Sequence, residues 1–564
     1  MLIISTIRLE MNDWLYNAGL VGLYNILNHS NASSLKKNNN GFEFDIEELD
    51  NFEEKYFEYF MDKYQYILPY NKFESLSNYL NNFEEKYFKE NSEFIGDIND
   101  YIGLLKKKLT SNSYSNTYPL LKDLDIDFFE EGKKLKKIKF KKNDTDEEKL
   151  KVIKETVESL ILINSKLKEK VVKKYLCSKD VIYNIINNFW NNISILHKQN
   201  NKNDHFLQFK NDFVDTTLNY LKKDISKAKY NCCVCDRKIT KLSKPESFDL
   251  VWINKIGVDQ NRKSSHFWNF NNTSYICPVC NLVYACVPAG FNNYYGKGIY
   301  INKNNNFKSL VESNNISFKK DEGIHSYFDL ENFTYRNILN SLESVEINKK
   351  RLELENIQII KFDKENSLRP YTFNILSKSM INVLKKEKKR LEFIINKYIK
   401  VSNDDYISLY DATINNLYNN SLLFNLINES MNIQFRNDGI IKDFLINLIY
   451  INNTFLNTKG ERGMNEKLIT MAKFKGEEFK QYYKQKNSEN KINGITYKLL
   501  NSLKTKNKNL FLDTIINSYM YLGKEIPSII LECNKNVESL QTIGYAFILG
   551  IQSTKKENID KGGN

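Results

Sequence analysis

The spacing of apolar side chains predicts strands mainly in the N-terminal part of the chain and helices almost everywhere else. Residues 2–9 are rich in β-branched side chains, which favour a strand. Apolar residues then recur at helical spacing up to Leu27, and Asn12 or Asp13 is placed to cap that helix. Two further strands are predicted at residues 248–253 and 355–363. The N-terminal part should therefore mix strands with helices.

Helical spacing dominates the rest of the chain. Strand signals nearly vanish beyond Pro370, and Ser402 with Asp405 three residues later is a capping-box pattern that should open a helix. Glycine and proline are scarce, with 21 and 7 residues, which favours long helices. Further helical segments are predicted at residues 146–230, 439–456, 464–487, 508–522 and 537–551.

Two local features of the first hundred residues add detail. Gly19 and Gly22 lie inside the first predicted helix, where each costs stability unless a packed helix or a ligand backbone approaches closely. The heptapeptide Asn-Phe-Glu-Glu-Lys-Tyr-Phe occurs at residues 51–57 and again at 82–88. We expect two similar amphipathic helices there, because two copies do not make a solenoid.

The most specific motif is a pair of Cys-x2-Cys knuckles. Cys232 and Cys235 form the first, Cys277 and Cys280 form the second, and 41 residues separate them. Two such turns offer four thiolates, the number that tetrahedral Zn²⁺ prefers. The gap exceeds the about 15–20 residues of a compact ribbon, so the finger should contain an insertion. Four thiolates leave no open coordination position, so this Zn²⁺ should be structural.

Alternatives remain for the cysteines at this stage. Two disulfides would use the same four residues, although a Lys-rich chain without a secretory signal should keep its thiols reduced. Two other cysteines are further candidate metal ligands: Cys233 could act with Cys235 as a Cys-x-Cys pair, and Cys286 is a spare candidate. His266 has aromatic neighbours, which are typical of a packed side chain. Cys177 and Cys533 lie in apolar helical segments, which are typical of a core.

The predicted fold class is α+β and predominantly helical, with a mixed N-terminal region, an inserted four-cysteine zinc finger and a C-terminal α-helical bundle. The predicted domains are an N-terminal α+β region at 1–230, a zinc-finger insertion at 231–290, the remainder of the N-terminal region with a connecting helix at 291–400, and the bundle at 401–564.

The composition favours a soluble, folded protein with an anionic partner. Hydrophobic residues make up 41% and aromatic residues 13%, which argues against disorder. The net charge of +13 suits nucleic acid without requiring it. Residues 1–7 are too short for a signal peptide, and no apolar run reaches the about 18 residues of a membrane span. We therefore expect a cytoplasmic protein.

Local basic clusters are the candidate nucleic-acid contacts. Lysines spaced among apolar residues at 133–142 could face phosphates or form a solvated loop. Glycines and tyrosines at 290–300 suit base stacking or a plain β-hairpin, and the basic aromatic helix at 464–487 suits a single strand or a solvated face. The candidates are Lys133, Lys134, Lys136, Lys137, Lys297, Lys385, Lys389, Arg390, Lys473, Lys475, Lys480 and Lys484.

Enzymatic signatures are nearly absent. The sequence has no P-loop, dinucleotide glycine fingerprint, H-E-x-x-H or G-x-S-x-G motif, and its five histidines show no metal-type spacing. Asp123, Asp125 and Asp127 alternate and could hold Mg²⁺ for nuclease chemistry, but a solvated strand face fits them as well. We expect a binding protein without catalytic residues. A metal-dependent nuclease and a stand-alone zinc-finger regulator are the alternatives.

Four stretches in order along the chain resemble a known family. They are Trp-Leu-Tyr-Asn-Ala-Gly-Leu-Val-Gly-Leu at 14–23, His-Phe-Trp-Asn-Phe at 266–270 ahead of the second knuckle, Tyr-Lys-Leu-Leu-Asn-Ser-Leu-Lys at 497–504 with Phe-Leu-Asp at 511–513, and Gln-Thr-Ile-Gly-Tyr-Ala-Phe-Ile-Leu-Gly at 541–550. With them the chain resembles the large subunit of the type I-B CRISPR Cascade complex, in its zinc-finger-bearing branch. The repeat at 45–94 and the lysine run at 133–142 match no part of that pattern.

The resemblance implies a non-catalytic subunit of an RNA-guided surveillance complex in antiviral defence. Such a subunit contacts the 5′ handle of the guide RNA, reads the short flanking motif in duplex DNA and helps to recruit a separate helicase-nuclease. Its C-terminal bundle resembles the small subunits that hold the displaced strand. The implied partners are therefore the guide RNA, the target DNA with its displaced single strand, the other Cascade subunits and the helicase-nuclease.

Overall fold

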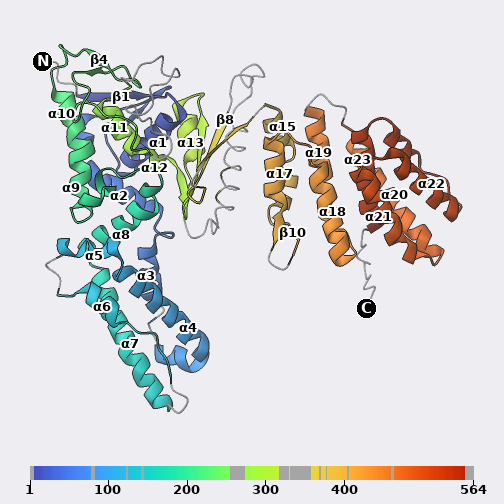
Figure 1. The fold of residues 1–564 in the computed structure, drawn as a ribbon, viewed down its shortest axis with the longest axis horizontal. Helices are drawn as coiled ribbons and strands as arrows, with labels where there is room; N and C mark the ends of the chain where they lie inside the picture. The colour runs from blue at the N-terminus through green and yellow to red at the C-terminus, as the bar shows by residue number, and fades with distance from the viewer. Residues whose placement is uncertain are drawn as a thin grey trace, which may run out of the picture. The chain divides into compact units, whose positions relative to one another are not determined.

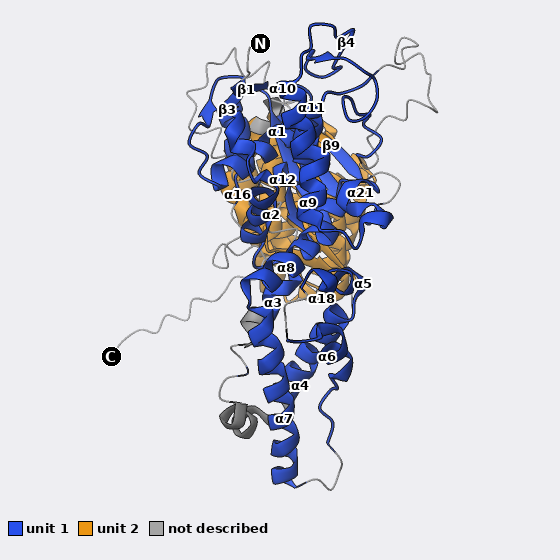
Figure 2. Cartoon of the chain, turned by 90° about the vertical axis from the view of Figure 1, so that its left-hand side faces the viewer, with its two compact units in different colours: residues 1–345, 357–373 blue, residues 346–356, 374–564 orange. Residues whose placement is uncertain are grey.

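The computed structural model describes residues 5–77, 80, 83–121, 125–140, 145–253, 274–316, 330, 334, 357–366, 370–376, 378–402, 405–458 and 463–552. The chain forms two compact units, coloured separately in Figure 2. Unit 1 comprises residues 1–345 and 357–373, and unit 2 comprises residues 346–356 and 374–564.

Unit 1 mixes strands with helices. Its described helices are α1 (Trp14–His29), α2 (Phe52–Lys63), α3 (Pro69–Ser77), α4 (Phe83–Leu109), α5 (Asn112–Ser115), α6 (Phe128–Lys134), α7 (Asp146–Leu167), α8 (Lys170–Asn184), α9 (His205–Phe209), α10 (Thr216–Lys222), α11 (Pro278–Ala285), α12 (Val287–Gly290) and α13 (Phe307–Asn314). Its strands are β1 (Thr6–Glu10), β2 (Lys36–Lys37), β3 (Gly41–Asp45), β4 (Tyr230–Asn231), β5 (Lys238–Ile239), β6 (Asn292–Tyr294), β7 (Lys297–Lys303), β8 (Ile357–Asp363) and β9 (Tyr371–Leu376), within which the units divide. Helices α4, α6 and α7 extend from the sheet-bearing part as an arm (Figures 1 and 2).

The strands of unit 1 form antiparallel ladders. A three-stranded sheet has the order β1-β3-β2, and a four-stranded sheet has the order β6-β7-β8-β9. In β1 the burial alternates, so that Ile7 opposite Phe44 and Leu9 opposite Phe42 form the buried face. The β6–β7 hairpin turns at Tyr295 and Gly296, so the glycine–tyrosine stretch forms a β-hairpin.

Helix α1 lies at the centre of unit 1. Asp13 caps it, because its side chain accepts hydrogen bonds from Leu15 N and Tyr16 N. The helix packs backbone to backbone against α11 and α12: a Cβ at Gly19 would lie 2.3 Å from Val283 O, and one at Gly22 would lie 2.0 Å from Cys286 O. A packed helix therefore explains both glycines.

Gly22→Ala should lower the free energy of unfolding by about 3 kcal/mol, since backbone atoms cannot yield to the added methyl group as a flexible side chain would. The matched control is Gly96→Ala in α4, where nothing lies within 4 Å of the added Cβ, and the better helix propensity should add up to about 1 kcal/mol. Chemical denaturation of both variants measures the difference. Equal stabilities would contradict the close α1–α12 packing.

Unit 2 is mainly helical. Its described elements are α15 (Lys378–Lys386), α16 (Lys388–Ile394), β10 (Tyr398–Lys400), β11 (Tyr406–Ser408), α17 (Leu409–Tyr418), α18 (Phe424–Asp438), α19 (Ile446–Thr458), α20 (Glu466–Gln485), α21 (Ile492–Lys504), α22 (Lys508–Leu522) and α23 (Val537–Gln552). Helix α23 is buried on nearly all sides. It packs closely on α20, because a Cβ at Gly550 would lie 1.9 Å from Lys473 O. The α+β, predominantly helical fold class is confirmed.

Most predicted elements form where the sequence places them. The first helix, the strand at 355–363 and the helices at 464–487, 508–522 and 537–551 appear as α1, β8, α20, α22 and α23. The last six residues of each heptapeptide copy, 52–57 and 83–88, are helical and lie at the starts of α2 and α4.

Three local predictions are wrong. Residues 248–253 form no strand but two isolated bridges, Phe248 to Ile276 and Ile253 to Trp190. Strands continue beyond Pro370, because β9 and the hairpin of β10 and β11 follow it. Ser402 opens no helix, since that hairpin intervenes, and the next helix, α17, is capped by Ser408, whose hydroxyl accepts from Asp411 N.

Candidate metal centre

The first knuckle is the turn of a short hairpin. Strands β4 and β5 pair with Tyr230 opposite Ile239. Between them, Cys232 N donates to Arg237 O at 2.8 Å and Asp236 N donates to Cys232 O at 3.1 Å. Asp236 takes a left-handed conformation with φ of 58°, which closes the turn. The turn brings the Cys232 and Cys235 side chains to one side.

The second knuckle is the beginning of a helix. Cys277 is the N-cap of α11, Pro278 occupies the first turn, and Cys280 follows on the same turn. The backbone N–H of Cys277 donates to Sγ of Cys232 at 3.3 Å. The start of a helix favours negative charge, which works against the thiol contacts and the burial that raise the pKa of Cys277 and Cys280.

The four predicted cysteines come together in space. Their sulfurs all lie within 4.8 Å of one another, with Cys232 Sγ 3.7 Å from Cys280 Sγ and Cys235 Sγ 3.6 Å from Cys277 Sγ. A tetrahedral site with Zn–S bonds of about 2.3 Å requires sulfurs about 3.8 Å apart. These separations fit Zn²⁺ and are too long for sulfur–sulfur bonds, and all eight cysteines are free.

The charges of the cluster also favour a cation. Contact with Cys232 and the other thiols lowers the pKa of Cys235, whereas contact with Cys232, together with burial, raises the pKa of Cys277 and Cys280 well above the ordinary value. Four adjacent thiolates repel one another unless a cation compensates them. The cluster is thus a metal-binding site, and its four sulfurs fit Zn²⁺.

The surrounding elements hold the knuckles in place. Asn12 Nδ2 donates to Val234 O at 2.8 Å, and Thr217 Oγ1 donates to Pro278 O at 3.1 Å. Arg237 Nη2 donates to Arg8 O at 2.7 Å, and the charges of Cys235 and Cys277 raise the pKa of Arg237 against the effect of burial. The metal centre is therefore part of the framework of unit 1.

Residues 225–292 match the family model of a CRISPR-associated protein, Cas_CXXC_CXXC. The matched segment contains both knuckles, so the part of the chain that forms the metal centre is similar to this CRISPR-associated family. The comparisons with curated proteins and with solved structures found no match. Among the described helices, none is long and apolar enough to cross a membrane.

The zinc affinity of the metal centre should fall as the solution is acidified. Because the raised pKa values keep Cys277 and Cys280 protonated at neutral pH, Zn²⁺ must displace at least two protons on binding. Each displaced proton changes the affinity about tenfold per pH unit, so the loss from pH 7.5 to 6.5 should be at least about 100-fold. Competition with a coloured chelator measures it, and an affinity independent of pH would contradict the protonation described.

The remaining candidate ligands lie elsewhere. Cys286 is buried outside the cluster, and Cys177 and Cys533 are buried in helical segments as predicted. Cys233 is exposed beside the cluster, and partial desolvation by neighbouring groups, together with the charge of Cys232, raises its pKa to about 11. His266 lies outside the described residues.

The lysine run of unit 1 is split between two environments. Lys133 and Lys134 lie in the last turn of α6 and pair with Glu130 at 2.8 Å and Glu131 at 2.7 Å. Lys136 and Lys137 are exposed on a segment anchored by buried Leu135 and Ile138, and within the described residues they make no salt bridge. Lys297 lies on β7, 3.4 Å from Asp363.

Several of the predicted basic residues of unit 2 are engaged within it. Arg390 donates to Glu387 at 2.6 Å and to Glu466 at 2.9 Å, and it lies over the Tyr450 ring at 4.2 Å. On α20, Lys473 pairs with Asp443, Lys475 with Glu478 and Lys484 more loosely with Glu489, at 3.1, 2.7 and 3.9 Å, while Lys480 lies half-buried on the same helix. Lys385 lies in the last turn of α15, and Lys389 is exposed on α16 without a salt bridge in the described part of the chain.

The alternating aspartates are not one cluster in the described residues. Asp127 caps α6, since its Oδ1 accepts from Phe129 N and Glu130 N. Asp125 is exposed, and Asp123 lies outside the described residues. Asp127 is thereby occupied in helix capping.

Sequence reasoning missed the residues that support the metal centre. Asn12 was considered only as a helix cap, and Thr217 and Tyr220 carried no motif; Tyr220 OH donates to Lys238 O at 2.8 Å. Arg237 could have been found, because a cation two residues after a thiolate pair is a simple electrostatic signal.

Proposed function

We propose that this CRISPR-associated protein is the non-catalytic large subunit of a type I-B RNA-guided surveillance complex in antiviral defence. In this role it contacts the 5′ handle of the guide RNA and reads the flanking motif of the target duplex. It also holds the displaced strand and helps to recruit a separate helicase-nuclease. The observation that carries the proposal is the family match over residues 225–292, which contain the four clustered cysteines.

The chemistry of the metal centre supports a structural role. When bound, Zn²⁺ would take its four ligands from Cys232, Cys235, Cys277 and Cys280. Three of these side chains are fully buried. The residues of the centre therefore clamp a hairpin to the start of α11, a framework task that fits a binding subunit.

Exposed cations support the binding role. Lys136, Lys137 and Lys389 have no salt bridge within the described residues and are free to neutralise phosphates. The exchange of a DNA duplex for a guide–target heteroduplex is nearly balanced in free energy. A few contacts between the protein and the nucleic-acid backbone are therefore enough to favour the heteroduplex. A positive net charge of +13 adds attraction that does not depend on sequence.

The test is co-expression of the tagged chain with a guide RNA and the other subunits of such a complex. The chain should co-purify with the guide RNA, and the assembly should bind duplex DNA that carries the flanking motif. The chain alone, in Mg²⁺, should leave DNA uncut.

A guide-independent chain would contradict the proposal. Tight binding of one defined duplex without any guide RNA would support a stand-alone regulator instead. Mg²⁺-dependent cutting that Asp125→Ala abolishes would support a nuclease.

A further inference from the structure

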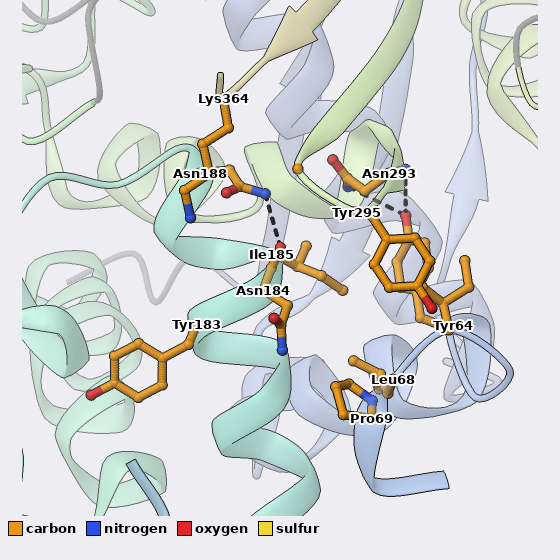
Figure 3. A pocket seen from close by; sticks show the side chains of 12 residues that line it. Tyr64, Leu68, Pro69, Tyr183, Asn184, Ile185, Asn188, Asn293, Tyr295 and Lys364 are labelled. Carbon is orange, nitrogen blue, oxygen red and sulfur yellow. Dashed lines mark hydrogen bonds between the residues drawn. The ribbon is translucent and has the colours of Figure 1, made fainter. Parts of the chain in front are cut away.

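Unit 1 contains a cavity of about 230 Å³ that is lined by four segments of the chain. Tyr295 and Asn293 come from the β6–β7 hairpin, Leu68 from the turn before α3, and Asn184 and Ile185 from the end of α8. In Figure 3, Tyr295 faces Ile185 and Asn184 across the cavity, with Leu68 and Pro69 below. The volume corresponds to seven or eight waters at about 30 Å³ each, which is the scale of a planar heterocycle.

Tyr295 is held over this cavity in an unfavourable backbone conformation. It has φ of 42° and Gly296 has φ of 85°, so both central residues of the two-residue turn are left-handed. Such turns favour Asn-Gly, and a bulky residue at the first position is an outlier. Tyr295 is nevertheless 58% exposed, and its ring centroid lies 4.8 Å from that of Tyr294. The ring is a presented aromatic surface.

The walls combine apolar and amide groups. Leu68 and Ile185 are buried, and Asn293 is 3% exposed with an Oδ1 that has no hydrogen-bond partner among the described residues. Asn184 Nδ2 donates to Asp180 O at 2.8 Å, and its exposed side chain also lines the cavity. The exposed Asn184 amide and the Tyr295 ring suit a flat ligand with donors and acceptors on its edge.

Two cations lie near the mouth. Lys364 lines the cavity, its side chain is exposed, and it makes no salt bridge within the described residues. Lys72 Nζ lies 5.7 Å from the centroid of the Tyr295 ring. A ligand whose flat part lies in the cavity could therefore place a negatively charged group at the mouth, beside these two lysines.

We propose that this cavity takes one unstacked nucleobase of a nucleic-acid single strand, stacked on Tyr295, with the adjoining phosphate at Lys364. The proposal rests on the nucleic-acid-binding function proposed above and assigns to it a base-binding position. A free nucleotide has the same chemistry, but the exposed ring and the outward cations favour a strand that continues past the mouth.

The test compares full-length, zinc-loaded chains in binding a fluorescein-labelled dT12 strand and the same strand with abasic sites. The wild type should bind dT12 about tenfold more tightly than the abasic strand, because one base stacked on an aromatic ring contributes about that factor. Tyr295→Asn should remove this preference. Asparagine suits the left-handed turn, so the melting temperature should hold or rise. Tyr66→Ala, at an exposed tyrosine outside the cavity, is the matched control and should keep the preference.

Each other outcome decides against the assignment. If Tyr295→Asn keeps the preference, or if the wild type binds both strands equally, the cavity proposal is wrong while phosphate binding and the proposed function stand. If the wild type binds neither strand at low salt, both proposals are wrong. Displacement of dT12 by micromolar AMP or CMP would identify the occupant as a free nucleotide and overturn the assignment to a strand.

Discussion

The Cys277→Ser, Cys280→Ser double variant is expected to bind no zinc and to lose the fold of unit 1. Serine hydroxyls do not ionise to replace thiolates, and two ligands cannot complete the tetrahedron. Binding of structural Zn²⁺ contributes about 10–16 kcal/mol in zinc-finger peptides, which matches or exceeds the about 5–15 kcal/mol stability of a whole domain. Metal content and circular dichroism of the purified variant measure the two losses.

Loss of the metal should also disturb the packing of the central helix of unit 1. Cys277 caps α11, and α11 with α12 packs backbone to backbone on α1, the central helix of unit 1. Cys233→Ser is the matched control, because Cys233 is exposed beside the cluster and should leave metal content and stability unchanged. A folded double variant, or a Cys233→Ser variant that loses its zinc, would contradict the assignment of ligands.

Arg390→Ala should destabilise unit 2 by about 3–5 kcal/mol. Glu387 is 1% exposed and is held by Arg390 on one oxygen and by Thr454 Oγ1 on the other, at 2.6 and 2.5 Å. Removing the guanidinium leaves a buried carboxylate without its compensating charge, which is the costly way to break an ion pair. Chemical denaturation followed by fluorescence measures the change.

Lys389→Ala is the control variant, because it should affect nucleic-acid binding but not stability. Lys389→Ala should leave the free energy of unfolding within about 0.5 kcal/mol, because the side chain is exposed and has no salt bridge in the described residues. It should weaken the affinity for single strands in low salt, since one phosphate contact is lost. The account would be contradicted if Arg390→Ala were fully stable, because the network around Glu387 would then contribute little.

The metal centre was predictable because its signal is local. Two residues of each knuckle are close in sequence, and the chemistry of Zn²⁺ requires two such pairs to meet. The sequence could not show that the sulfur of Cys232 lies next to that of Cys280 and the sulfur of Cys235 next to that of Cys277. These neighbours depend on how the hairpin packs against the start of α11.

Other features failed where tertiary context decides. Ser402 with Asp405 satisfies a capping pattern, yet the strand pairing of Tyr398 with Ser408 shifts the helix start to Leu409. Arg390 looked like one of a row of surface cations, and only the fold reveals the buried Glu387 beneath it. The cavity under Tyr295 joins segments more than a hundred residues apart, so no local pattern could indicate its shape.

The central claim is that the thiolates of Cys232, Cys235, Cys277 and Cys280 close a structural zinc site. X-ray absorption spectroscopy on the purified full-length chain, with metal content measured on the same sample, tests it directly. The account predicts one zinc per chain with four sulfur ligands at about 2.3 Å. A chain that is folded without zinc, or a zinc with nitrogen or oxygen ligands in place of sulfur, would contradict it.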